Sequence, residues 1–216
     1  MKSRLAVICS KNPTNILLET VTKLKEYYPE FDIVIIDSNS QDTHIYDSLP
    51  SDCMVELCKN NNYELGAWVY AFNKYNTYDV YMFIQDSLIP KTRIQNFDSV
   101  TYENGTVYTF HYNATVGGGG YYDNLKNVYR NTHLDYIAEM EEDTPILASA
   151  HSSFILDKEH VPILLKLEEP YIEKKLIKSK IDSWLTERTF GIVSDKYDLK
   201  RINIWDFFKK VNGNRM

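Results

Sequence analysis

The segment D-I-V-I-I-D, residues 32–37, sets four consecutive aliphatic side chains between two aspartates and runs into the polar stretch S-N-S-Q-D, residues 38–42. A short, continuous apolar run of this kind is typical of a strand buried on both faces, as in a parallel sheet. We expect further short strands at residues 5–9, 54–58 and 78–84, and helices at residues 16–28 and 65–75. The order strand, helix, strand, strand, helix, strand predicts an α/β fold with helices on both faces of a mainly parallel sheet.

The second half of the chain is less regular. We expect strands at residues 106–111 and 152–156, and helices at residues 125–142, 172–190 and 205–211. No internal repeat or linker-like stretch divides the 216 residues, and α/β folds of this length often form one unit. The sequence therefore predicts a single domain over residues 1–216.

The composition restricts the classes of function. Thirty acidic and 24 basic residues give a net charge of −6, which argues against a protein that binds DNA or RNA through a basic face. No run of about 18 apolar residues occurs, so the sequence predicts no transmembrane segment, and the first apolar run is shorter than the core of a signal peptide. Cys9, Cys53 and Cys58 form no disulfide framework. We therefore expect reduced thiols and a cytoplasmic protein.

Polar side chains gather where the expected strands end. Ligands of open α/β sheets bind at the carboxyl ends of the strands, which makes these side chains candidates for a binding site. An aspartate that ends a buried strand must have its charge satisfied or used. In chain order the candidates are Ser10, Asp37, Ser38, Asn62, Gln85 and Asp86.

This order of elements resembles the GT-A glycosyltransferases, and in particular their large family-2-like group. In that group a strand ends in D-D-x-S-x-D, a helix begins near an N-x-G motif, and a later strand ends in D-x-D. The corresponding segments here are I-I-D-S-N-S-Q-D at 35–42, N-N-Y-E-L-G-A-W at 61–68 and Y-M-F-I-Q-D-S-L-I-P at 81–90. The resemblance covers residues 4–95. It implies a GT-A-like (Rossmann-like) domain with a nucleotide-binding half, residues 1–95, and an acceptor-side half, residues 96–216.

The resemblance also implies a nucleotide-sugar donor, with UDP as the expected carrier. The residues that would hold this donor are Ser10, Asp37, Ser38, Asn62 and Gln85. Asp37 would accept hydrogen bonds from the base or the ribose. The structural alternative is an aspartate that caps its own loop.

The metal site implied by the resemblance departs from the family pattern. Q-D-S, residues 85–87, has one carboxylate where D-x-D has two. One carboxylate, two phosphate oxygens and water can suffice for Mn²⁺ or Mg²⁺. We therefore expect Asp86 to bind the ion and His151, later in the chain, to be a further ligand. The structural alternatives are a turn-capping aspartate and a histidine satisfied within the fold.

A further segment, I-D-S-W-L-T-E-R-T-F-G at 181–191, resembles the E-D-x-x-L-x-x-R helix of inverting family members, with I-D in place of E-D. The resemblance implies that Asp182 is the general base that deprotonates the acceptor hydroxyl, and Glu187 is the rival base. Charges on a solvated helix face are the structural alternative. The matching offsets belong to Asp182, Leu185, Arg188 and Gly191.

The resemblance therefore implies a metal-assisted, inverting glycosyltransferase that moves a hexosyl or pentosyl group onto a glycan, lipid-linked or protein acceptor. The four glycines at residues 117–120 are candidates for a lid over the donor. Two alternatives stay open. A nucleotidyltransferase of nucleotide-sugar synthesis usually needs a glycine loop after the first strand, where this chain has C-S-K-N-P, residues 9–13. A non-catalytic nucleotide- or sugar-binding module would account for the incomplete D-x-D motif.

Overall fold

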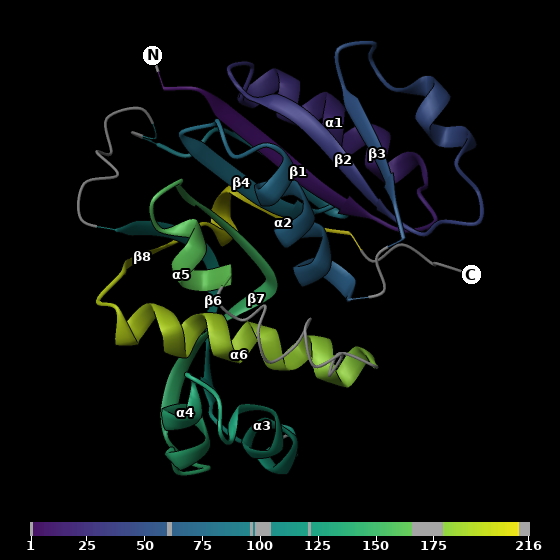
Figure 1. Cartoon of the computed structure of the whole chain (residues 1–216). Coiled ribbons are helices and arrows are strands. Elements are labelled where there is room, and N and C mark those ends of the chain that lie inside the picture. Colours follow the sequence, from purple (N-terminus) through teal and green to yellow (C-terminus); the bar gives the residue numbers. More distant parts are fainter. Residues whose placement is uncertain are drawn as a thin grey trace.

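A seven-stranded sheet with the order β3-β2-β1-β4-β7-β6-β8 forms the centre of the molecule (Figure 1). The structure, a computed structural model, describes residues 2–59, 62–95, 97, 105–120, 122–165 and 179–211. Four neighbouring strands are parallel, namely β1 (Arg4–Ser10), β2 (Asp32–Ser38), β3 (Met54–Cys58) and β4 (Val80–Gln85). Antiparallel pairing joins β4 to β7 (Pro145–Asp157) and β7 to β6 (Thr106–Thr115), and β6 pairs in parallel with β8 (Lys200–Asn203).

Helices cover both faces of this sheet because its central strands alternate between two hydrophobic cores. One core contains Ile8, Ile35 and the buried side of α1 (Asn15–Tyr27). The other contains Val7, Ile36 and the buried sides of three helices, α2 (Tyr63–Lys74), α5 (Val161–Leu165) and α6 (Lys180–Lys196). The predicted α/β class, a mainly parallel sheet flanked by helices in a single domain, is confirmed.

Two small helices and a two-stranded ribbon complete the described chain. Helices α3 (Tyr122–Tyr129) and α4 (Asp135–Glu139) lie on the far side of α6 from β1 and β4 (Figure 1). The ribbon pairs β5 (Leu88–Pro90) with β9 (Phe208–Lys210) in antiparallel fashion. Single 3₁₀ turns lie at His44–Ser48 and Trp205–Phe207.

The expected helix at residues 125–142 is wrong as one element, since α3 ends at Tyr129 and α4 begins at Asp135. Thr132 explains the break. Its hydroxyl donates to the Tyr129 carbonyl and accepts from the Leu134 N–H, and such side-chain bonds compete with the helical pattern.

The expected helix at residues 205–211 is also wrong. Only Trp205–Phe207 turns, and Phe208–Lys210 is strand β9. The backbone of β9 pairs with β5 while Phe208 packs in the core against Tyr28 and Phe110, so long-range pairing overrides the local helical pattern. The expected helix at residues 172–190 corresponds to α6 from Lys180, which continues to Lys196, and its residues 172–178 lie outside the described part of the chain.

Within the described ranges, no helix is both long enough and apolar enough to cross a membrane. Cys9, Cys53 and Cys58 are all half-buried.

Candidate functional site

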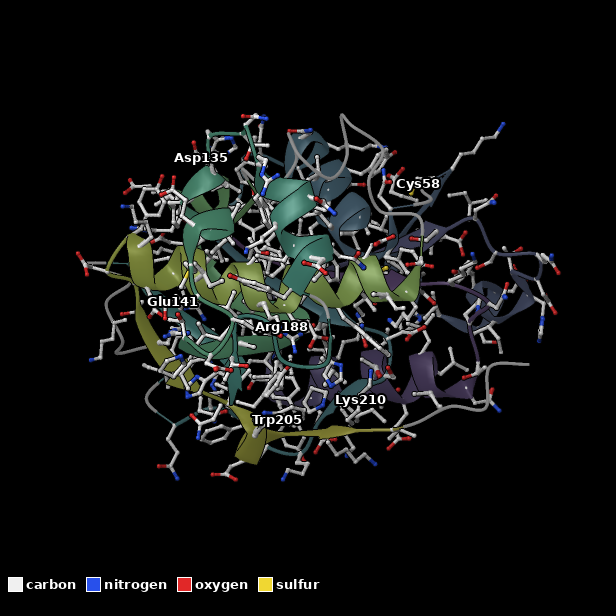
Figure 2. All side chains as sticks on the ribbon, turned by 90° about the horizontal axis from the view of Figure 1, so that it is seen from below. Cys58, Asp135, Glu141, Arg188, Trp205 and Lys210 are labelled. Atoms are coloured by element: carbon white, nitrogen blue, oxygen red, sulfur yellow. The ribbon has the colours of Figure 1, made fainter. Side chains whose placement is uncertain are left out.

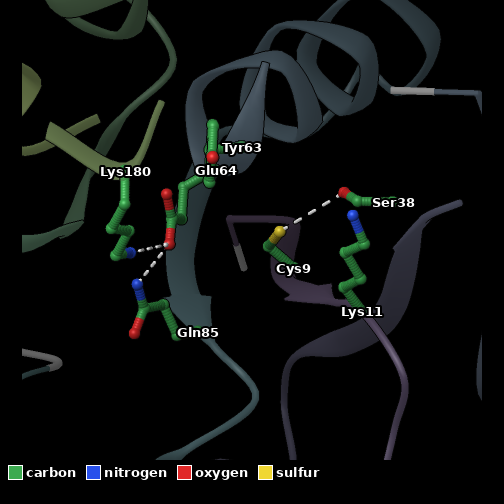
Figure 3. A pocket seen from close by; sticks show the side chains of 7 residues that line it. All are labelled: Cys9, Lys11, Ser38, Tyr63, Glu64, Gln85 and Lys180. Atoms are coloured by element: carbon green, nitrogen blue, oxygen red, sulfur yellow. Dashed lines mark hydrogen bonds and ion pairs between the residues drawn. The ribbon is translucent and has the colours of Figure 1, made fainter. Parts of the chain in front are cut away.

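A pocket of about 240 Å³ opens where β1, β2 and β4 end (Figure 3). Because these strands are parallel and in register, with Ser10 opposite Asp37 and Cys9 opposite Gln85, their last residues meet at one edge of the sheet. The pocket is lined by Cys9, Lys11, Ser38, Tyr63, Glu64, Gln85 and Lys180.

Two of the five expected donor-binding residues, Ser38 and Gln85, line this pocket directly. Ser10 is buried, and its hydroxyl donates to the Asp86 carboxylate over 2.8 Å. Asn62 is half-buried at the N-terminus of α2, where its side chain makes no capping hydrogen bond. The structure thus brings the predicted residues to one end of the sheet, although it does not place all of them on the pocket surface.

Asp37 is a buried carboxylate that holds its own loop together. Its Oδ1 accepts from the Ser40 N–H over 2.9 Å, and its Oδ2 accepts from the hydroxyls of Ser40 and Tyr46. Burial and the neighbouring Asp37 raise the pKa of Tyr46, so this phenol stays protonated as a donor. The contacts within the loop match the loop-capping alternative, and a contact with a base or ribose stays a prediction.

A polar network crosses the pocket on the β4 side. The Gln85 amide nitrogen donates to Glu64 Oε1 over 2.5 Å, and Lys180 Nζ lies 3.7 Å from the same oxygen (Figure 3). The other end of the amide, Gln85 Oε1, accepts from Lys210 Nζ, which also donates to Ser87 Oγ over 2.6 Å. Glu64 of α2 and Lys210 of β9 therefore meet at the carboxyl end of β4, and Lys180 of α6 lies beside Glu64.

A kink in β7 brings His151 to the same edge of the sheet. His151 and Ser152 both have a left-handed backbone, with φ of 60° and 47°, three and two residues before the β4 partner Phe154. The kink is fixed from two sides. The Trp68 indole N–H donates to the Ser152 carbonyl over 2.9 Å, and Glu187 Oε1 accepts from the His151 N–H over 2.9 Å. Neighbouring elements thus hold a backbone conformation that is unfavourable in isolation.

The His151 ring packs edge-on against Trp205, with 5.7 Å between the ring centroids. Burial, followed by the charges of Lys210 and Lys180, lowers the pKa of His151 to about 4. The imidazole is therefore neutral at neutral pH. The same two ammonium groups make its surroundings unfavourable for a further cation.

A second hollow, of about 230 Å³, lies beside α6 and is lined by Tyr112, Trp184, Glu187 and Arg188. Burial raises the pKa of Glu187, and the hydrogen bond from the His151 N–H only partly offsets this. Glu64 and Lys180, which line the first pocket, also act on the charge of Glu187, so the two hollows are electrostatic neighbours. Trp184 is 39% exposed and presents an aromatic surface in this hollow.

Asp182, the expected general base, sits in the first turn of α6 and caps it. Its Oδ2 accepts from the Ser179 N–H over 2.8 Å and from the Ser179 hydroxyl over 2.9 Å, and the hydroxyl accepts in return from the Asp182 N–H. This reciprocal arrangement is a capping box. The structure gives Asp182 a structural role and leaves its catalytic role a prediction.

The other matching residues of the 181–191 segment pack the helix. Leu185 is fully buried, and Arg188, labelled on α6 in Figure 2, donates to the Gly118 carbonyl. Gly191 lies so close to β7 that an added Cβ would be 2.0 Å from the Leu147 carbonyl oxygen. Contacts with β7 and with the turn after β6 therefore give these residues a structural role.

The glycines at residues 117–120, expected as a lid, form a hydrogen-bonded turn after β6. The Gly117 N–H donates to the Glu142 carbonyl and the Gly120 N–H to the Gly117 carbonyl. This turn borders α6 through Arg188. A role as a lid over the donor stays a prediction.

The side chains near Asp86 do not fit a divalent-ion site. In the described part of the chain, no three His, Cys, Asp or Glu side chains gather into a group that could hold an ion. The neutral oxygens that could assist Asp86, those of Gln85 and Ser87, accept hydrogen bonds from the Lys210 ammonium group. A divalent ion that drew on these two oxygens would have to displace this ammonium.

Three residues of this network were missed by the sequence analysis, namely Glu64, Lys180 and Lys210. Glu64 lies in the first turn of α2, and Lys180 is the first residue of α6. An acidic and a basic side chain at the starts of these two helices were the only features of the sequence that could have indicated them. Lys210 carried no signal, because its segment was expected to be helical.

No protein-family model and no curated protein sequence matches the chain. The crystal structure of S. aureus TarS matches 98% of this chain with a TM-score of 0.53 and 12% identity, and the match covers 37% of that protein. A second match is the crystal structure of GalNAc-T7 with UDP, GalNAc and Mn²⁺, over 76% of this chain and 36% of that one, with a TM-score of 0.51 and 13% identity. The chain thus spans little more than a third of each of these two proteins.

Proposed function

Because the chain has the fold of GT-A-type glycosyltransferases, we propose that it transfers a sugar from a nucleotide-sugar donor to a hydroxyl acceptor. The observation that carries this proposal is the pair of neighbouring hollows at the carboxyl edge of the sheet. One is lined by Lys11 and Lys180, and the other by a half-buried carboxylate, Glu187. A donor needs cationic groups for its diphosphate, and an acceptor hydroxyl needs a base.

The donor site of this proposal is the pocket at the ends of β1, β2 and β4. Parallel α/β sheets bind ligands at this edge, and Ser38 and Gln85 offer polar contacts there. Three further residues lie at the same edge but do not line the pocket, namely Ser10, Asp37 and Asn62. UDP is the proposed carrier, since GalNAc-T7, of similar fold, was crystallised with UDP.

The acceptor site is the hollow beside α6. Trp184 provides a flat face for a sugar ring, and Glu187 provides the base. The acceptor oxygen forms a bond to the anomeric carbon, the bond from that carbon to the diphosphate oxygen breaks, and Glu187 takes the hydroxyl proton. One direct displacement of this kind inverts the anomeric centre. A raised pKa makes Glu187 a stronger base when ionised than an exposed carboxylate.

We propose Glu187, rather than Asp182, as the base, because the Asp182 carboxylate is engaged in the capping box. Glu187→Gln should lower the turnover of a UDP-sugar by about 10²-fold or more, because the acceptor then loses its base. UDP affinity should stay close to that of the parent. The measurement is UDP release from a panel of UDP-sugars, paired with calorimetric titration of UDP.

Asp182→Asn is the matched control on the same helix. It should keep turnover while lowering the unfolding free energy by about 0.5–2 kcal/mol, the usual effect of losing a cap. If Asp182→Asn abolishes turnover and Glu187→Gln does not, Asp182 is the base and the assignment of Glu187 is wrong.

The same assays separate the alternatives. A binding module would bind UDP without turnover, and a nucleotidyltransferase would release pyrophosphate from UTP and a sugar phosphate. The prediction of Mn²⁺ or Mg²⁺ is tested by the titration in the next section. A glycan, lipid-linked or protein acceptor and a cytoplasmic location remain predictions from the sequence.

A further inference from the structure

Lys210 contacts the residues at the carboxyl end of β4, where the sequence predicts a divalent ion. Its ammonium group donates to Gln85 Oε1 and to Ser87 Oγ, the two neutral oxygens on either side of Asp86. The side chain is half-buried, so its charge is less screened than that of a surface lysine. A permanent cation therefore sits at this edge of the sheet without any metal ligand set.

The position of Lys210 is fixed by the strand that carries it. β9 pairs with β5, and Phe208 anchors β9 in the core against Tyr28 and Phe110. Successive residues of a strand point to opposite sides. Lys209 is accordingly exposed and paired with Glu19 over 2.7 Å, whereas Lys210 reaches the β4 end. Figure 2 shows Lys210 on the C-terminal segment that runs below α6 in that view.

Two further lysines belong to the same edge. Lys180 and Lys11 line the donor pocket, and Lys180 together with Lys210 acts on the charge state of His151. Glu64 partly compensates Lys180 at 3.7 Å and also accepts from Gln85. A diphosphate, with its several negative charges, complements three ammonium groups that come from the loop after β1, from α6 and from β9.

We infer that Lys210 replaces the divalent ion, so that the chain binds a nucleoside diphosphate through lysine ammonium groups and without a metal. This inference rests on the proposed function and departs from the expectation of Mn²⁺ or Mg²⁺. During transfer the same ammonium stabilises the negative charge that grows on the departing diphosphate. Lys210 is then a substrate-binding residue, and Gln85 and Ser87 position it.

The test is calorimetric titration of the full chain with UDP and with uridine, in EDTA and in excess Mn²⁺. UDP should bind equally well, within about threefold, under both conditions. Lys210→Met should weaken the binding of UDP by about 10- to 100-fold, the usual effect of losing one charge-assisted hydrogen bond. Uridine, which lacks phosphate, should bind the variant and the parent alike.

Lys210→Arg keeps the charge and should retain most of the UDP affinity. Lys209→Met, one residue away but facing solvent, should change the affinity for neither UDP nor uridine. Binding of UDP to the parent only in the presence of Mn²⁺ overturns the inference, as does a folded Lys210→Met variant with parental UDP affinity. The titration of the parent decides the matter even if Lys210→Met fails to fold. If neither UDP nor GDP, ADP or CDP binds under either condition, the proposed function itself is wrong and the inference falls with it.

Discussion

His151 is a half-buried imidazole between two ammonium groups, and this environment has a consequence for stability. Its pKa is about 4 in the folded chain and about 6.5 in an unfolded one, so the unfolded chain binds the proton more readily. His151 therefore contributes stability above pH 6.5 that is lost as the pH falls towards 4. The loss between these limits is up to about 3 kcal/mol.

His151→Asn should remove this part of the acid sensitivity, because asparagine does not titrate and tolerates a positive φ. Urea unfolding at several pH values between about 7.5 and 4 measures how steeply the unfolding free energy depends on pH. An unchanged slope in His151→Asn would show that His151 is not the group responsible.

At the scale of single residues, the ends of the strands could be predicted from the sequence, whereas the charged side chains around them could not. The position of Gln85 and Asp86 at the carboxyl end of β4 could be predicted, because both follow an unbroken apolar run. Their roles towards a donor and a metal stay predictions. The capping contacts of Asp37 and Asp182 were open alternatives, since a carboxylate at a turn and one in a binding site look alike in sequence. Lys210 could not be predicted, because its partner Gln85 is 125 residues away.

Among the secondary-structure elements, α6 depends most on one small residue. An alanine at Gly191 would put its Cβ 2.0 Å from the Leu147 carbonyl oxygen, a backbone atom of β7 that can yield only if the helix or the strand moves. Gly191→Ala should therefore lower the unfolding free energy by at least about 2 kcal/mol, despite the better helix propensity of alanine. Urea unfolding followed by circular dichroism is the measurement.

Ile181→Ala, at an exposed position of the same helix, is the matched control and should change stability by less than about 0.5 kcal/mol. Parental stability in Gly191→Ala would mean that α6 does not lie this close to β7.

The elements of the first half were predictable because their patterns are local. Buried strands β1, β2 and β4 read as unbroken apolar runs, and α1 has its Thr14 cap and a clear buried side. The second half depends on a local side-chain contact and on a pairing between distant segments. Residue Thr132 breaks the expected helix through its own hydroxyl, and β9 forms only because β5 is available as a partner. Neither contact leaves a periodic pattern in the sequence.

For the whole molecule, the single domain predicts one cooperative unfolding transition, since the two cores share the same sheet. Trp68 is buried in one core and Trp205 packs against the other. Two variants that lack Trp184, one keeping only Trp68 and the other only Trp205, should lose their native fluorescence at the same urea concentration. Clearly separate midpoints, after correction for the stability of each variant, would show that the two faces of the sheet unfold independently.

The tie between Lys210 and Gln85 also sets an order of events during synthesis. Lys210 is translated 125 residues after Gln85, so a nascent chain exposes the ends of β1, β2 and β4 long before the cation that completes them has left the ribosome. Until then, Gln85 and Ser87 lack their ammonium partner and β5 lacks the strand that pairs with it. A partly made chain thus lacks the ammonium group of Lys210 at this edge of the sheet. On the proposed role of Lys210, donor binding then requires a chain in which this residue has left the ribosome.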